Sequence, residues 1–246
     1  SSNYIELGIA QADLIDAAYQ GTGVFTGKKC QNFKAVASLY PEACQIVVRK
    51  DSDIETIDDL QGKKVSVGEE ESGSELNARQ ILEMSGLPED LIKTKHLDYP
   101  DAADKLAAGK IDAFFFTAGA QTTVVEELAK HCDIRLLNLD DKLRGKLTTA
   151  YPFYSDYTIP AGTYTGQEED IQTVCVQSVL VASDALDNAT VKKLTKTIFA
   201  HQKGLQYATS VDLQLNESSA IKGVPIPFHP GAAAYYSERG INVKTE

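Results

Sequence analysis

Apolar residues recur along the chain in two alternating patterns. Short, nearly continuous apolar runs, typical of buried strands, alternate with stretches whose apolar positions lie three or four apart, as on one face of a helix. The predicted strands are 6–10, 33–39, 44–49, 64–67, 111–116, 134–139 and 173–182. The predicted helices are 14–18, 52–60, 73–85, 101–108, 121–130, 188–205 and 231–238. This alternation predicts open, largely parallel α/β sheets rather than a sandwich.

Two segments interrupt the alternation. Tyr40, Pro41 and Glu42 separate the strands 33–39 and 44–49, so the pattern predicts a break there. Residues 151–166 are dense in tyrosine, proline and glycine, which favours a loop or a connection between lobes. Tyr154 and Tyr157 lie in this segment, and either lining of a ligand cleft or packing of a connection would explain them.

The most informative motif runs from Val65 to Gln80, where a strand leads through a small-residue loop into a helix. Ser72 and Glu75 have the spacing of a capping box, which places Gly73 and Ser74 in the first helical turn. Backbone N–H groups there have no partner within the helix, and the positive end of the helix dipole favours an anion. An ordinary capped helix without a ligand explains the motif equally well.

A second small-residue loop, 117–119, follows the predicted strand 111–116 and precedes a predicted helix. In open α/β sheets, ligands bind at the carboxyl ends of strands, where loops lead into helices. Both loops therefore belong to one candidate binding site. Glu69, Glu70 and Glu71 precede the first loop, and we expect them to form a solvated turn, because a carboxylate turned inward would repel a bound anion.

Composition excludes several classes of function. The formal net charge of −11 argues against nucleic-acid binding. No apolar run reaches the roughly 20 residues that span a bilayer, and the first residues do not resemble an export signal, so we expect any such signal to have been removed. The four histidines are isolated, and the four cysteines lie far apart, which leaves a disulfide open but indicates no metal site. The hydrolase, zinc-protease, nucleotide and dinucleotide signatures are missing, so we expect neither an enzyme nor a cofactor.

Several motifs in this order resemble those of one family. They are Gly8-Ile-Ala-Gln-Ala-Asp13, Leu39-Tyr-Pro-Glu42, Gln45-Ile-Val-Val-Arg-Lys50, Gly62-Lys-Lys-Val-Ser-Val-Gly68, Ser72-Gly-Ser-Glu-Leu-Asn-Ala-Arg79, Phe115-Phe-Thr-Ala-Gly119, Tyr151-Pro-Phe-Tyr154, Ile159-Pro-Ala-Gly-Thr-Tyr164 and Pro227-Phe-His-Pro-Gly231. Together they resemble the TAXI family, the solute-binding subunits of a class of TRAP transporters. The resemblance implies a two-lobed, type II periplasmic-binding-protein fold, with an open, mostly parallel sheet flanked by helices in each lobe. It implies that residues 1–48 and 177–246 form lobe I and residues 49–176 form lobe II.

The resemblance also implies a function. A small carboxylate solute such as glutamate, glutamine or a related dicarboxylate would bind between the lobes and be delivered to an integral membrane TRAP permease. The protein would then be periplasmic or otherwise extracytoplasmic, and we expect a monomer. Two alternatives stay open, namely a ligand-sensing module and an enzyme on the same fold, such as a transferase or decarboxylase.

The resemblance assigns ligand contacts to nine residues: Gln11, Tyr40, Ser72, Gly73, Ser74, Asn77, Thr117, Ala118 and Gly119. The hydroxyl groups of Ser72 and Ser74 would hold a carboxylate, and Gln11 and Asn77 would supply amide hydrogen bonds. Capping or satisfaction of a strand end is an equal alternative for Gln11 and Asn77. Members of the family carry further strands and helices before the position of Glu6, so we expect part of the lobe I sheet to be absent from this sequence.

Overall fold

The computed structural model describes residues 5–209, 211, 213 and 215–246 and divides into two compact units. Unit 1 comprises Ser1–Pro41 and Val176–Glu246, and unit 2 comprises Glu42–Cys175. The chain passes between the units within two long strands, β2 (Phe33–Arg49) and β8 (Ile171–Ser183). The predicted break at 40–42 is wrong, because β2 continues through it. Residues 39–42 are only half-buried, which tolerates a proline without an N–H group.

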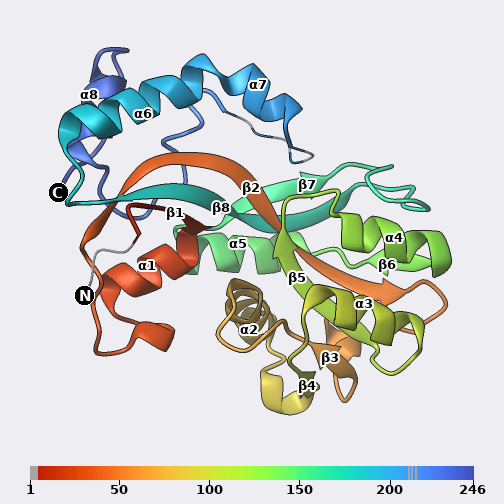
Figure 1. Ribbon diagram of the computed structural model, residues 1–246. Helices are drawn as coiled ribbons and strands as arrows, with labels where there is room; N and C mark the ends of the chain where they lie inside the picture. The colour runs from red at the N-terminus through yellow and green to blue at the C-terminus, as the bar shows by residue number, and fades with distance from the viewer. Residues whose placement is uncertain (1–4, 210, 212, 214) are drawn as a thin grey trace. The chain divides into compact units, whose positions relative to one another are not determined.

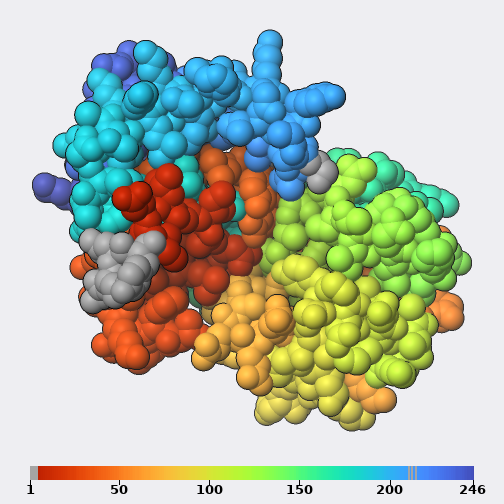
Figure 2. All heavy atoms as spheres, viewed as in Figure 1, coloured from red at the N-terminus to blue at the C-terminus, as the bar shows by residue number. Residues whose placement is uncertain are grey.

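In unit 1, strand β1 (Leu7–Gln11) pairs antiparallel with the second half of β8, with Leu7 opposite Ala182. Helix α1 (Ala12–Gln20) follows directly and ends where Gly21 adopts a left-handed conformation. A 3₁₀ turn, η1, spans Gly23–Phe25. Leu7 and Ile9 on β1 are 41% and 59% exposed, and the β1–α1 segment is the red region of Figure 2. This strand therefore presents apolar side chains to solvent.

Three helices complete unit 1: α6 (Asn188–Ala200), α7 (Gln202–Tyr207) and α8 (Pro230–Ser237). The predicted helix 188–205 is therefore two helices that meet at His201, whereas the predicted tail helix is confirmed. Helices α6 and α8 pack closely, since a Cβ on Gly231 would lie 2.4 Å from the carbonyl oxygen of Asn188. Next to this contact, the rings of Phe199 and Tyr235 stack with centroids 5.4 Å apart.

In unit 2, the second half of β2 lies between β5 (Ala113–Ala118) and β6 (Ile134–Leu136), antiparallel to both. Strand β3 (Lys64–Ser66) pairs in parallel with β5 and with β4 (Lys93–Lys95). Strand β7 (Ser155–Ile159) pairs antiparallel with the first half of β8. The α/β class is thus confirmed. Within unit 2, β3 pairs in parallel with β4 and β5, whereas β2 runs antiparallel to β5 and β6, and β7 runs antiparallel to β8.

Four helices belong to unit 2: α2 (Gly73–Ser85), α3 (Tyr99–Ala107), α4 (Thr123–His131) and α5 (Asp141–Ala150). Figure 1 shows α3 and α4 next to each other, and both pack on the face of the sheet that carries Phe114 and Phe116. Helix α2 also packs against β5, and α5 packs against α2. Both α2 and α4 begin shortly after the carboxyl end of a strand, β3 and β5 respectively.

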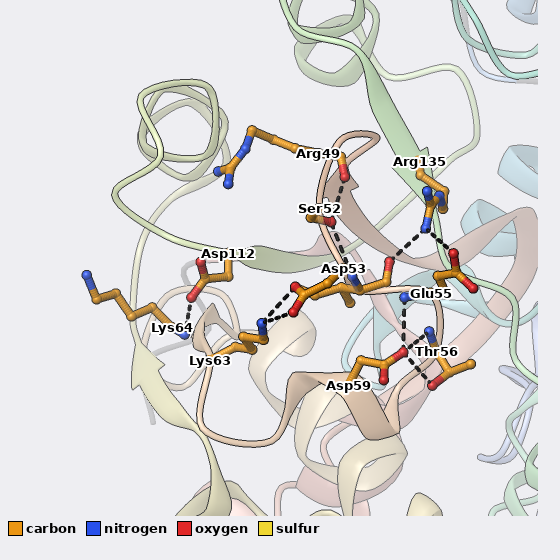
Figure 3. Close-up of polar contacts among 11 residues, drawn as sticks. Arg49, Ser52, Asp53, Glu55, Thr56, Asp59, Lys63, Lys64, Asp112 and Arg135 are labelled. Carbon is orange, nitrogen blue, oxygen red and sulfur yellow. Dashed lines mark hydrogen bonds and ion pairs between the residues drawn. The ribbon is translucent and has the colours of Figure 1, made fainter.

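The connection from β2 to β3 contains a single 3₁₀ turn, η2 (Asp58–Leu60), in place of the predicted helix 52–60. Side-chain hydrogen bonds replace the helical ones (Figure 3): Asp59 Oδ2 accepts from the N–H groups of Glu55 and Thr56. These bonds hold the pKa of Asp59 below its usual range. The guanidinium group of Arg135 donates to the carbonyl oxygens of Ile54 and Lys50, which ties the connection to β6.

Sequence patterns missed three elements of unit 2 and mistook a fourth. Strand β7 lies inside the segment 151–166 that was predicted to be a loop or a connection between lobes, and α5, β4 and the 3₁₀ turn η3 (Glu89–Leu91) were not predicted. Strand β4 has polar side chains, and β7 exposes Ser155, Asp156 and Thr158, so neither shows the apolar run of a buried strand. Pairing with a neighbouring strand, which local sequence does not encode, makes them strands.

Candidate ligand-binding site

The start of α2 has the cap that the sequence predicts. Ser72 is extended and its Oγ accepts the N–H of Glu75 at 3.1 Å. The carboxylate of Glu75 turns back to accept the N–H of Glu71 at 2.6 Å. Within the part of the chain that the structure describes, the N–H groups of Gly73 and Ser74 donate no hydrogen bond. Two backbone donors therefore remain available at the positive end of α2.

Gly68 brings the loop into close contact with this helix start. It adopts a φ of +107°, which L-residues rarely adopt. A Cβ at this position would lie 2.9 Å from Ser74 Cβ and 3.0 Å from Ser72 Oγ. Only glycine therefore lets the backbone after β3 pass this close to the first turn of α2.

The acidic residues around this helix start are either exposed or paired. Glu69, Glu70 and Glu71 are exposed, which confirms the expectation of a solvated turn. Glu75 is buried, and its Oε1 lies 3.0 Å from Arg79 Nη2. This guanidinium group offsets the buried negative charge, so the N–H donors are not opposed by an unpaired carboxylate.

Three hydrogen bonds connect Ser74 at the start of α2, Thr117 on β5 and Tyr99 on α3 with one another. The N–H of Thr117 donates to Ser74 Oγ at 2.9 Å, and Tyr99 Oη donates to the carbonyl oxygen of Thr117 at 3.1 Å. Ser74 Oγ and Tyr99 Oη are 2.6 Å apart, and since the tyrosine proton is already used, the serine is the donor. Burial raises the pKa of Tyr99, which keeps this hydroxyl protonated. The Ser74 hydroxyl thus fixes the two loops relative to each other.

Asn77 is one turn further along α2 and is buried. Its Nδ2 donates to Tyr154 Oη at 2.7 Å, and Tyr154 Oη donates to Gln80 Oε1 at 2.6 Å. Tyr154 is 4% exposed and packs with Tyr151 and Phe153. These contacts attach the chain after α5 to α2. Within unit 2, Tyr154 therefore packs a connection, as the second of its two interpretations predicts.

The second small-residue loop leads into α4. Thr117 and Gly119 are buried and Ala118 is half-buried, at the carboxyl end of β5. Helix α4 begins without a side-chain cap of its own from Thr122. Instead, the hydroxyl of Tyr164 accepts the N–H groups of the two residues just before the helix, Gln121 at 3.0 Å and Thr122 at 3.3 Å, and we call this arrangement the distant cap of α4. Two helix starts, those of α2 and α4, therefore flank the end of β5.

Gln11 and Tyr40 belong to unit 1, apart from the other seven predicted ligand residues, which belong to unit 2. Gln11 ends β1 and precedes α1, and its side chain does not cap that helix. Its Nε2 is buried and has no partner among the described residues. Tyr40 is half-buried in β2.

Within the described residues, a surface pocket of about 300 Å³ lies in unit 2 between β6 and the segment 164–171. Its lining mixes the cations Lys50 and Arg135 with acidic side chains, and the Arg135 guanidinium already bonds to two carbonyl oxygens. None of the predicted ligand residues lines it.

In the part of the chain that the structure describes, no cluster of His, Cys, Asp and Glu side chains could hold a metal ion, and all four cysteines are free thiols. Nor does any helix there have the length and apolarity to cross a membrane.

Sequence reasoning missed the three side chains that organise the two helix starts, namely Tyr99, Tyr164 and Gln45. Tyr164 Oη donates to Gln45 Oε1 at 2.9 Å, although the two residues are 119 positions apart. Tyr99 is 25 positions from Ser74. No local pattern signals such pairs, since each partner looks like an ordinary aromatic or polar residue of its own element.

Solved structures resemble the fold. A putative sulfonate ABC transporter protein, the periplasmic sulfonate-binding protein SsuA from Methylobacillus flagellatus KT, matches with a TM-score of 0.52 and 14% identity, over 100% of this chain and 71% of that one. XAC2383 from Xanthomonas citri, bound to chloride ion, matches with a TM-score of 0.52 and 12% identity, over 87% and 73%. At these identities the likeness shows the fold alone, and it confirms the periplasmic-binding-protein architecture. A family model described as the NMT1-like family matches residues 1–240, and the chain therefore belongs to the NMT1-like family.

Proposed function

We propose that this protein is a non-catalytic, extracytoplasmic solute-binding protein that captures a small carboxylate and delivers it to an integral membrane permease. The periplasmic-binding-protein fold supports the general role. The resemblance of its motifs to the TAXI family supports a TRAP permease as the partner and glutamate, glutamine or a related dicarboxylate as the solute. We assign unit 2 to lobe II and unit 1 to lobe I of that architecture.

One observation carries the choice of an anionic solute. The N–H groups of Gly73 and Ser74 have no acceptor within the described residues, and they lie at the positive end of a 13-residue helix. Gly68 leaves no room for a side chain beside them, and the bonds of Ser74 to Thr117 and Tyr99 hold them in place. Preorganised donors of this kind suit a carboxylate oxygen.

The same geometry refines the role of Ser74. Its hydroxyl proton and one lone pair are engaged within the protein, so we propose that its backbone N–H, rather than its hydroxyl, contacts the solute. Ser72 Oγ accepts the N–H of Glu75 and keeps its proton for donation. Gly73 would contribute its N–H, and Asn77, Thr117, Ala118, Gly119, Gln11 and Tyr40 stay proposed ligand residues.

Thermal unfolding of the purified protein with a panel of solutes tests this function. The panel contains glutamate, glutamine, 2-oxoglutarate, glutarate and, because N–H donors also suit sulfonates, short alkanesulfonates. We expect at least one carboxylate to raise the melting temperature by mass action and to bind with a 1:1 stoichiometry in calorimetry. Stabilisation by sulfonates alone would overturn the carboxylate assignment, and a response to none of the panel would overturn the proposed solute class.

A matched pair of variants then locates the site. Ser72→Ala removes the cap and a proposed donor, and we expect solute affinity to fall by about tenfold, the scale of one hydrogen bond to a charged group. Ser85→Ala, which removes the hydroxyl that donates to Leu82 at the other end of α2, is the control and should bind normally. Equal affinity of both variants and the wild type would remove Ser72 from the site.

A further inference from the structure

A buried amide beside the start of α4 lacks the acceptors it needs. Gln45 lies on β2 opposite Phe116 and is 2% exposed. Its Nε2 has no hydrogen-bond partner among the described residues. A buried amide nitrogen carries two N–H groups, and leaving them unsatisfied costs free energy that native structures normally avoid.

The orientation of this carboxamide follows from its neighbours. Tyr164 Oη accepts two backbone N–H groups at the start of α4, so its own proton must go to an acceptor. The partner at 2.9 Å is therefore the oxygen of the Gln45 carboxamide, and exchanging the oxygen and nitrogen positions would set donor against donor. The unpartnered atom is thus the nitrogen, and it is a donor.

Further donors lie around it. Through Tyr164, the Gln45 carboxamide is two hydrogen bonds away from the first residues of α4. The Thr122 hydroxyl is buried and has no partner among the described residues. The N–H groups of Thr123 and Val124 donate no hydrogen bond in that same part of the chain. The Thr122 hydroxyl and two backbone N–H groups thus lie at the positive end of a nine-residue helix, and the hydroxyl of Tyr164 links the Gln45 carboxamide to the residues just before that helix.

We propose that the start of α4 is an acceptor-selective subsite, in which Gln45 Nε2, Thr122 Oγ1 and the N–H groups of Thr123 and Val124 donate to the two oxygen atoms of one carboxylate group of the solute. This inference rests on the proposed function and deepens it. Gln45 becomes a specificity-determining residue, because its N–H groups donate to a carboxylate or carbonyl oxygen and cannot pair with an ammonium group, which is itself a donor. The start of α2 would hold one end of the solute and the start of α4 the other.

Two solutes of matched length test the selectivity. Glutarate and 4-aminobutyrate share a carboxylate, and they differ in whether the other end is a carboxylate or an ammonium group. Calorimetry on the wild type should show a preference for glutarate. Gln45→Glu keeps the acceptor for Tyr164 but replaces the N–H donors with a second oxygen, so glutarate should lose about tenfold or more in affinity and 4-aminobutyrate should not.

Matched variants separate this effect from a change in folding. Gln172→Glu adds the same charge at a half-buried position of unit 2 whose side chain accepts from Thr158, and it should bind both solutes as the wild type does. Thr122→Val should weaken glutarate, whereas Thr122→Ser should not. If Gln45→Glu does not fold, Gln45→Met removes the donors without adding charge. A preference for glutarate that survives in the Gln45 and Thr122→Val variants would overturn the subsite.

Crystal structures with bromide and with glutarate test the α4 subsite even if neither glutarate nor 4-aminobutyrate binds in calorimetry. We expect crystals soaked in bromide to show an anomalous peak within hydrogen-bond reach of Gln45 Nε2, and glutarate crystals to show a carboxylate oxygen there. An ordered water alone at Gln45 Nε2 in both crystals would overturn the subsite and leave the proposed function standing. Conversely, a bromide peak without binding of any panel solute would uphold the donor site and reject the proposed solute class.

Discussion

The starts of α2 and α4 are alike in position but differ in how they are built. Helix α2 follows β3 and helix α4 follows β5, and these two strands are neighbours in the sheet. At each helix start, backbone N–H groups have no acceptor among the described residues. The start of α2 is capped by Ser72 and Glu75, which are neighbours in sequence. The start of α4 is capped by Tyr164, which lies 42 and 43 positions away from the residues it bonds.

The difference teaches which capped helix starts can be recognised in a sequence. A local cap leaves a motif, because its residues must have fixed spacing. A cap supplied by a distant hydroxyl leaves no motif in the sequence, since only the fold brings the hydroxyl and the helix start together. Such a cap also couples the helix start to whatever holds the tyrosine, here Gln45 on β2.

The largest expected effect comes from Gly68→Ala, which acts on the local cap. The new Cβ would lie within 3.0 Å of Ser74 Cβ at a φ of +107°, and the combined strain and overpacking should cost about 4 kcal/mol of unfolding free energy. Urea denaturation measures this. Gly62→Ala is the control, because it has a φ of +73° but no atom near its Cβ, and should cost about 1 kcal/mol. Equal losses would show that close packing at Gly68 is unimportant.

A smaller effect should follow from Tyr164→Phe, which acts on the distant cap. The variant leaves Gln45 Oε1 and two N–H groups of the α4 start without partners, at a cost of about 2 kcal/mol. Denaturant unfolding should show this loss, and hydrogen exchange should be faster in the variant than in the wild type at the amides of Gln121 and Thr122. Tyr207→Phe, at a side chain that is 95% exposed, should change neither measurement.

A third helix start, that of α8 in unit 1, extends the comparison to the pH dependence of stability. We expect it to show the smallest change in unfolding free energy of the three. His229 Nδ1 accepts the N–H of Gly231 at 3.1 Å, so the cap needs the neutral imidazole. Burial lowers the pKa of His229 below its ordinary 6.5, against the opposing effects of Leu186 and nearby carboxylates. The unfolded chain therefore binds the proton more readily, and stability present above pH 6.5 is lost as the pH falls through the lowered pKa.

The loss at His229 should be at most about 1.4 kcal/mol for each pH unit. Denaturation between pH 8 and pH 5 measures it against His229→Asn, which keeps a capping side chain but does not titrate. We expect the wild type to lose more stability than this variant below pH 6.5. Parallel curves for the two proteins would contradict the role of His229 as the titrating cap.

The parts of the fold that sequence predicted are those with a strong local signal. The sequence predicted the buried strand β5 with its three phenylalanines, the capped start of α2 and the tail helix. Hydrophobic periodicity and capping motifs are both properties of a short stretch of sequence. The strand break at 40–42 was wrong because Pro41 lies in a half-buried part of β2. The helix at 52–60 was wrong because Asp59 takes the N–H groups of Glu55 and Thr56 for its own side chain.

The candidate site divides in the same way. Ser72, Gly73 and Ser74 were predicted from the capping box, and 117–119 from the place of a small-residue loop after a strand. The engagement of Ser74 with Tyr99, and of Asn77 with Tyr154, depends on contacts between elements that no spacing reveals. Gln45 was not predicted as a donor, because a glutamine in a strand has no distinguishing pattern until its neighbours are known.

The distant cap of α4 also constrains protein engineering. Consider a chimera in which residues 117–131 are replaced with those of a relative in order to change the solute. The new loop and helix would come without the tyrosine hydroxyl that bonds them in their own protein, and would have to fit Tyr164 of this chain instead. Transplantation would then require three separate pieces of chain, carrying the loop, Tyr164 and Gln45 together. Recognition on this scaffold would accordingly change as a linked set of residues rather than one loop at a time.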